Sequence, residues 1–260
     1  MKTIIANWKM TVGSRESVAL ARGTLLLLRG RKVTPEVVIC PSFTALSEVH
    51  KVVARSSVWL GAQDVCWEEQ GAYTGEVSPR MLTELGVSHV LIGHSERRGR
   101  LGETDEMIHQ KLVNALEHGL TPILCIGETQ QEREAGIQQE RVREQLVAAF
   151  SGVRLKSNAR VFVAYEPVWA IGSGHTPEVP EVVAMHTFIR TVLTEALLGS
   201  ARTAVRVLYG GSVDGENAYR FLREDEVNGV LVGGASVKLN QLKEIMTSAS
   251  EVLEAKEGIV

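Results

Sequence analysis

Short runs of apolar, largely β-branched residues recur along the whole chain, and helix-forming or glycine-rich stretches separate them. Each run is only five or six residues long, which suits a strand buried on both faces better than a helix. The pattern predicts eight strands, at residues 3–8, 36–40, 58–62, 89–93, 122–127, 160–165, 205–210 and 229–233.

The stretches between these runs contain good helix formers with apolar residues at helical spacing. Six helices are predicted clearly, at residues 14–28, 44–54, 104–117, 138–150, 181–197 and 240–253. Strands that alternate with helices favour a parallel sheet. Eight such units in about 250 residues fit a closed (β/α)8 TIM barrel with a parallel eight-stranded core. No linker interrupts the pattern, so we expect one domain over residues 1–260, with the last few residues frayed.

An open, doubly wound sheet is the competing architecture. It would usually carry a glycine-rich turn after the first strand and an acidic residue about 20 positions later. The first strand here is followed instead by Asn7-Trp8-Lys9-Met10, which is not a phosphate-binding turn of that kind. The barrel is therefore the preferred prediction.

Composition narrows the class of protein further. Hydrophobic residues make up 44% of the chain and charged residues 23%, which is ordinary for a globular protein and excludes a disordered one. The net charge of −3 and the scattered lysines and arginines argue against nucleic acid or a membrane surface as a partner. No run of 18 apolar residues occurs, and the first apolar stretch is too short for a signal peptide. We therefore expect a cytoplasmic location, in which Cys40, Cys66 and Cys125 stay reduced.

Polar side chains stand at the carboxyl ends of several predicted strands, where barrel enzymes carry their catalytic groups. Asn7 and Lys9 end the first strand, His94 follows the fourth, and Glu166 follows the sixth. Taken singly, the histidine could be structural and the glutamate a solvated surface charge. The lysine could simply extend its ammonium group into water. Their convergence on one rim favours an acid–base pair beside a cation.

Two glycine-rich turns follow the last two strands, Gly210-Gly211-Ser212 and Gly233-Gly234. Glycine lets backbone N–H groups approach an anion closely, and barrels commonly bind phosphate at these two loops. The pair of turns predicts a phosphate site next to the acid–base pair.

The segment after the sixth strand has the composition of a lid over the site. Pro167 restricts the backbone at one end, and glycines mark the other. An apolar tip between such ends is predicted to close over the substrate and exclude water. The expected lid consists of Pro167, Val168, Trp169, Ala170, Ile171, Gly172, Ser173 and Gly174.

Eight sequence blocks together resemble the triosephosphate isomerase family over nearly the full chain. They include Ala-Asn-Trp-Lys-Met at 6–10, Ile-Gly-His-Ser-Glu-Arg-Arg at 92–98 and Tyr-Glu-Pro-Val-Trp-Ala-Ile-Gly at 165–172. The others lie at residues 61–64, 71–76, 125–128, 209–213 and 231–236, in the family's order and spacing.

The resemblance implies an isomerase of glycolysis and gluconeogenesis, which interconverts D-glyceraldehyde 3-phosphate and dihydroxyacetone phosphate through an enediolate. It implies Glu166 as the catalytic base, His94 as the electrophile and Lys9 as a catalytic cation. The residues implied to bind substrate are Asn7, Lys9, Gly172, Ser212, Gly233 and Gly234. Those implied to support them are Glu96, Cys125, Glu128 and Tyr209. No metal and no cofactor is implied.

Two other functions remain open beside this one. Another phosphate-binding barrel enzyme, such as an aldolase or an indole-forming synthase, would use the same cradle, although an aldolase needs a Schiff-base lysine within a strand. A catalytically silent phosphosugar binder would not need Glu166, His94 and Lys9 together.

The connection from Gln63 to Pro79 is longer than usual for a barrel loop and contains Trp67 and Tyr73. Such aromatic residues suit an interface, so a homodimer through this loop is expected. The resemblance implies that the loop inserts beside the partner's site, with Thr74 near the partner's Asn7 and Lys9.

The chain departs from the family pattern at several positions, among which Pro177 has a clear physical consequence. The resemblance implies that the hydroxyl group of Tyr209 bonds in the closed state to the backbone N–H at position 177. Proline has no backbone N–H, so this chain cannot form that bond. The other departures are at Ala6, Thr11, Ser173, His175 and residues 99–101.

Overall fold

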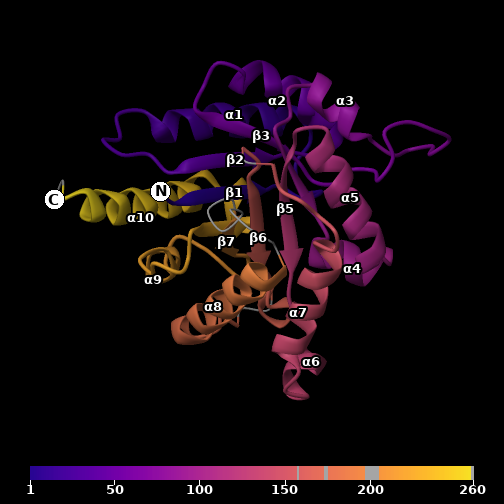
Figure 1. Ribbon diagram of the computed structural model, residues 1–260. Coiled ribbons are helices and arrows are strands. Elements are labelled where there is room, and N and C mark those ends of the chain that lie inside the picture. Colours follow the sequence, from indigo (N-terminus) through magenta and orange to yellow (C-terminus); the bar gives the residue numbers. More distant parts are fainter. Residues whose placement is uncertain (157, 173–174, 197–204, 259–260) are drawn as a thin grey trace.

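Eight parallel strands close into a barrel in the computed structural model, which describes residues 1–156, 158–172, 175–196 and 205–258 (Figure 1). Each strand pairs with its neighbours in the sequence, and β1 pairs with β8 to complete the ring. The strands are β1 (Thr3–Asn7), β2 (Glu36–Cys40), β3 (Val58–Ala62), β4 (His89–Ile92), β5 (Thr121–Ile126), β6 (Val161–Tyr165), β7 (Val205–Tyr209) and β8 (Gly229–Val232). The predicted (β/α)8 barrel is confirmed.

Helices surround the barrel, and all six predicted ones are present with ends shifted by a few residues. They are α1 (Ser14–Leu28), α2 (Leu46–Val53), α5 (Asp105–Glu117), α7 (Gln138–Ala149), α8 (Val179–Ala196) and α10 (Leu239–Glu257). Shorter helices that the apolar spacing did not predict are α3 (Pro79–Glu84), α4 (Ser95–Leu101), α6 (Gln130–Glu134) and α9 (Ala218–Leu222). Three 3₁₀ turns are also described, η1 (Phe43–Ala45), η2 (Val168–Ala170) and η4 (Gly234–Val237). Helices of five to seven residues are too short to show apolar periodicity over two turns.

Two apolar cores explain why the strand sequences are continuously apolar. Side chains alternate between the two faces of each strand. One set fills the barrel, including Ile5, Val38, Leu91, Phe162 and Leu208. The other set packs outward against the helices. The strands are therefore buried on both faces almost throughout, as the runs predicted, with Trp59 of β3 as an exposed exception.

Charged side chains close the amino-terminal end of the barrel. The Glu36 carboxylate accepts hydrogen bonds from Arg160, at 2.8 Å, and from Arg206, at 3.0 Å. Thr3 also donates to this carboxylate, at 3.0 Å. This ion cluster lies at the end of the barrel opposite the strand ends that carry the predicted site residues.

The connection between β3 and α3 projects from the barrel as the purple loop beside α5 in Figure 1. The rings of Trp67 and Tyr73 pack edge to face within it, with centroids 5.9 Å apart. At the other end of the chain, α10 runs to Glu257, and residues 259–260, where fraying was expected, lie outside the described residues. Over the described ranges, no helix is both long and apolar enough to cross a bilayer.

Candidate active site

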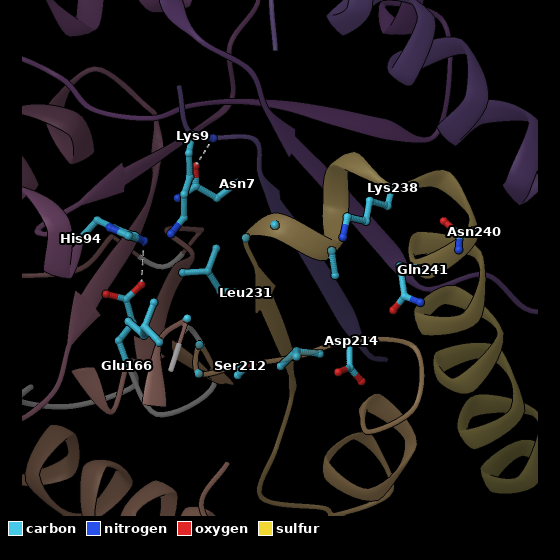
Figure 2. A pocket seen from close by; sticks show the side chains of 18 residues that line it. Asn7, Lys9, His94, Glu166, Ser212, Asp214, Leu231, Lys238, Asn240 and Gln241 are labelled. Atoms are coloured by element: carbon cyan, nitrogen blue, oxygen red, sulfur yellow. Dashed lines mark hydrogen bonds and ion pairs between the residues drawn. The ribbon is translucent and has the colours of Figure 1, made fainter. Parts of the chain in front are cut away.

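A cavity of about 540 Å³ opens at the carboxyl-terminal rim of the barrel (Figure 2). Every residue that was predicted to act in catalysis or to bind substrate lines this cavity. These residues are Asn7, Lys9, His94, Glu166, Gly172, Ser212, Gly233 and Gly234. Residues from the ends of three strands, β1, β4 and β6, and from the turns after β7 and β8 thus meet in one place.

His94 and Glu166 face each other at one side of this cavity (Figure 2). The Nε2 atom of His94 lies 3.2 Å from Oε1 of Glu166. His94 is also the N-cap of α4, and its Nδ1 atom accepts the backbone N–H of Glu96 at 3.3 Å. An Nδ1 that accepts a hydrogen bond carries no proton, so this geometry assigns a neutral ring with its hydrogen on Nε2. The imidazole therefore presents an N–H donor to the cavity.

Glu166 is 1% exposed, and backbone contacts fix its position. Its N–H donates to Ile126 at 2.7 Å, while its Oε2 accepts the N–H of Ser95 at 2.9 Å. Two glycines leave room for it: a Cβ on Gly127 would lie 1.8 Å from the Glu166 carbonyl oxygen, and one on Gly210 would lie 2.9 Å from its Cγ. The carboxylate is thus held at the rim, with Oε2 hydrogen-bonded to Ser95 and Oε1 facing His94.

Lys9 reaches the cavity from a backbone conformation that is unusual for a side-chain-bearing residue. Its φ angle is +51°, in the left-handed region that favours glycine. Asn7 accepts the N–H of Lys9 at 3.0 Å, and the Gln63 amide donates to its carbonyl at 2.8 Å. These two bonds hold a conformation that would otherwise cost about 1–3 kcal/mol.

The Lys9 ammonium is bound to Glu96 at 2.6 Å. Burial acts to raise the pKa of Glu96, but the hydrogen bond and charge of Lys9 outweigh it, so the pKa lies below its usual value. Glu96 therefore stays ionised and holds the lysine at the cavity wall. A Cβ on Gly233 would lie 3.0 Å from the Lys9 Cε, so the second glycine turn packs directly against this side chain.

The predicted lid segment follows β6 and forms the 3₁₀ turn η2 directly after Pro167. Trp169 is half-buried, and its indole N–H donates to Glu128 at 2.8 Å. The Arg133 guanidinium stacks over its ring at 4.3 Å. A buried carboxylate thus satisfies the indole N–H of Trp169. The predicted lid residues Ser173 and Gly174 lie outside the described residues.

The four residues expected to support the site surround the cavity without lining it. Glu128 is fully buried between Trp169 and the Tyr165 hydroxyl, which donates to it at 3.1 Å. Burial raises the pKa of Glu128. Burial also raises the pKa of the Cys125 thiol inside the barrel, with a further contribution from the charge of Glu166.

Further contacts explain why two arginines follow Glu96 in the sequence. Arg97 pairs with Asp64 at 2.8 Å, and Lys111 pairs with the same aspartate at 2.7 Å. Arg98 donates to the carbonyl groups of Gly93, at 2.7 Å, and Cys125, at 3.1 Å. Both arginines therefore anchor the start of α4, which carries His94 and Ser95.

Sequence reasoning missed several residues of this site. Gln63 donates to the backbone carbonyl of Lys9, and the Ser95 N–H donates to the Glu166 carboxylate. The cavity is also lined by Asp214, Lys238, Asn240 and Gln241. Their signals were weak, since each is an ordinary polar residue in a loop or at a helix start. Within the described ranges, no group of three or more histidine, cysteine or acidic side chains is arranged to hold a metal ion.

Replacing Tyr209 with phenylalanine is expected to change turnover by less than about threefold. The Tyr209 ring is buried, and its hydroxyl has no hydrogen-bond partner among the described residues. Pro177 offers no backbone N–H for it to accept in a closed state. Steady-state kinetics of Tyr209→Phe checks this, and a loss of a hundredfold would mean that the hydroxyl closes the lid through another partner.

The fold and this site define a class: a (β/α)8-barrel protein that combines a carboxylate, an imidazole and two glycine-rich turns at one rim. Comparison with known proteins identifies the family. The triosephosphate isomerase profile matches residues 2–249, and the chain belongs to that family.

Relatives named triosephosphate isomerase match almost end to end. The protein of Thermoanaerobacter pseudethanolicus is 43% identical over 243 residues, which cover 94% of this chain and 97% of that one. The protein of Dictyoglomus thermophilum is 40% identical over 247 residues, which cover 95% and 99%. The protein of Roseiflexus sp. (strain RS-1) is 44% identical over 243 residues, which cover 94% and 95%.

Proposed function

We propose that this chain interconverts D-glyceraldehyde 3-phosphate and dihydroxyacetone phosphate, a step of glycolysis and gluconeogenesis. The observation that carries this proposal is the contact of 3.2 Å between Glu166 and the Nε2 atom of His94 inside a cavity rimmed by glycine turns. A base and a hydrogen-bond donor side by side are what proton transfer next to a carbonyl group requires. Family membership and the names of the relatives support the same reaction.

Glu166 acts as the base in this proposal. It removes a proton from the carbon next to the substrate carbonyl and returns it to the neighbouring carbon. Without substrate, its Oε2 accepts the Ser95 N–H and its Oε1 lies 3.2 Å from Nε2 of His94. The substrate must therefore enter between Glu166 and His94 and replace at least one of these contacts.

His94 stabilises the oxygen that becomes negative as the proton leaves. Its neutral Nε2–H is already directed at the place where Glu166 meets the cavity. A fixed donor lowers the energy of a developing oxyanion without a reorganisation cost at the moment of reaction. The Lys9 ammonium adds positive charge at the cavity wall.

The phosphate group is assigned to the backbone N–H groups of Gly172, Ser212, Gly233 and Gly234. Gly172 has a φ angle of +67°, which an L-residue adopts only at a cost. An added Cβ at Gly233 would press on Lys9. Glycine at these positions thus lets the backbone, rather than side chains, face the anion.

A coupled assay with a glycerol 3-phosphate dehydrogenase and NADH tests this function. Starting from glyceraldehyde 3-phosphate, the account predicts NADH oxidation that depends on the protein. A silent phosphosugar binder would give none. An aldolase would require a second carbonyl substrate and would form or break a carbon–carbon bond, which product analysis reveals.

We further infer that the chain works as a homodimer through the loop from Gln63 to Pro79. Tyr73 is 40% exposed at the tip of this loop, and Met10, next to Lys9, is 97% exposed. Large apolar side chains left exposed beside the rim of the cavity suit an interface with a second copy of the chain.

We also propose that residues 1–260 form a single domain and that the protein is cytoplasmic. The buried, unbridged Cys40, Cys66 and Cys125 fit a reducing compartment.

The dimer proposal predicts that activity and assembly fall together on dilution. Sedimentation velocity is expected to give twice the chain mass at micromolar concentration, and replacing Tyr73 with aspartate is expected to shift the protein towards monomer with lower turnover. Glu84→Lys on α3 is a control of similar exposure. A monomer with full specific activity would contradict the proposal.

A further inference from the structure

Lys238 lies across the cavity from His94 and Glu166, on the side of Asn240 and Gln241 (Figure 2). It is exposed and stands at the junction of η4 and α10. Neither the strand ends nor the sequence blocks pointed to it. Its presence in the cavity wall changes the charge that an incoming anion meets.

The other charged groups of the wall are already engaged. The Lys9 ammonium is bound to Glu96 at 2.6 Å. Asp214 accepts the backbone N–H groups of Glu216, at 3.0 Å, and Asn217, at 2.9 Å, so it caps a turn. In the part of the chain that the structure describes, no ion pair joins Lys238 to a carboxylate. Its positive charge is therefore available to a ligand.

The backbone of Lys238 is fixed close to the predicted phosphate cradle. Its N–H donates to Ala235 at 3.2 Å, and its carbonyl accepts the N–H of Leu242 at 2.9 Å. The 3₁₀ turn that ends at Lys238 begins at Gly234. The flexible lysine side chain is therefore tethered to the same turn that presents the Gly233 and Gly234 N–H groups.

We propose that Lys238 is a positioning residue that draws the dianionic end of the substrate into the glycine cradle and favours phosphorylated over neutral substrates. This inference rests on the proposed function. The backbone N–H groups supply the hydrogen bonds, and Lys238 adds a second positive charge to that of Lys9, which is paired with Glu96. A positive charge at the mouth of a site raises the association rate of an anionic substrate. This attraction weakens as salt is added, because the screening length is about 8 Å at physiological ionic strength.

The test compares Lys238→Met with Lys238→Arg, which keeps the charge, and with Lys243→Met, which removes an exposed lysine of α10 outside the cavity. For glyceraldehyde 3-phosphate at low ionic strength, Lys238→Met is expected to lower kcat/KM about tenfold through KM, with kcat unchanged. The arginine variant restores the value, and the control does not change it. The dependence of kcat/KM on salt becomes shallower in Lys238→Met alone. With neutral D-glyceraldehyde as substrate, all variants match the parent.

Binding of inorganic phosphate, measured by calorimetry, separates this inference from the proposed function. Weaker binding by Lys238→Met but not by Lys243→Met supports the role of Lys238 even if the parent protein shows no isomerase activity. An active parent whose Lys238→Met variant keeps the same KM, phosphate affinity and salt dependence overturns the inference. A loss confined to kcat, or an equal loss with D-glyceraldehyde, also overturns it.

Discussion

Glu166→Gln is expected to lower turnover by about 10²- to 10⁴-fold, the usual contribution of a general base. Glutamine keeps the size of the side chain but does not take up a proton at neutral pH. The amide can accept from either Ser95 or His94 but not from both, since the two donors bind different carboxylate oxygens. Coupled kinetics gives the loss, and a melting curve shows whether the fold is retained.

The loss of activity in Glu166→Gln is expected in the proton-transfer step and not in the binding of the phosphate group. Binding of inorganic phosphate by Glu166→Gln is expected to match the parent, because the proposed cradle does not include this carboxylate. Glu134→Gln on α6, an exposed position outside the cavity, is the matched control and should keep full activity. Glu166→Asp withdraws the carboxylate by one methylene group, and displacement on the scale of about 1 Å can cost about 100-fold. Near-normal turnover of Glu166→Gln would remove this residue as the base.

His94→Asn is expected to lower kcat by about 10²- to 10³-fold, the typical cost of removing one oxyanion donor. Asparagine is a good N-cap, so its side-chain oxygen can replace the Nδ1 atom that accepts the Glu96 N–H. It is too short to place a donor where Nε2 meets Glu166. The substitution therefore separates capping of α4 from the catalytic hydrogen bond.

Unchanged thermal stability together with a large loss of kcat is the outcome that assigns His94 to the reaction. The matched control is His50→Gln on α2, a histidine that does not line the cavity. If His94→Asn retained kcat within a factor of ten, the donor would have to be another group of the wall.

The barrel could be predicted because its strands are buried on both faces. Apolar residues that fill the interior, such as Phe162 and Leu208, alternate with others that face the helices, such as Val163 and Val207. The resulting continuous runs are visible in the sequence itself. Short helices such as α4 and α9 have no such signal, because they depend on caps and on contacts with distant residues.

The principal site residues were predictable for a related reason. Glu166, His94 and Lys9 stand at or just after strand ends, and the topology of a parallel barrel brings those ends to one rim. The contacts that hold them were not predictable, since Gln63 and Glu96 meet Lys9 across 54 and 87 positions of the sequence. The hydrogen bond from Trp169 to Glu128 was not predictable either, because the two residues lie 41 positions apart. Pair contacts of this kind leave no local pattern.

Deuterium exchange reports whether Glu166 moves a proton between adjacent carbons of the substrate. Dihydroxyacetone phosphate is incubated with the protein in D₂O and followed by ¹H NMR spectroscopy. A carboxylic acid formed at Glu166 can exchange with solvent, so the account predicts deuterium on the carbon next to the carbonyl group as glyceraldehyde 3-phosphate appears. Glu166→Gln should lose the isomerisation and the exchange together. Product formed at the parent rate with no deuterium on carbon would indicate a direct hydride shift and would contradict the account.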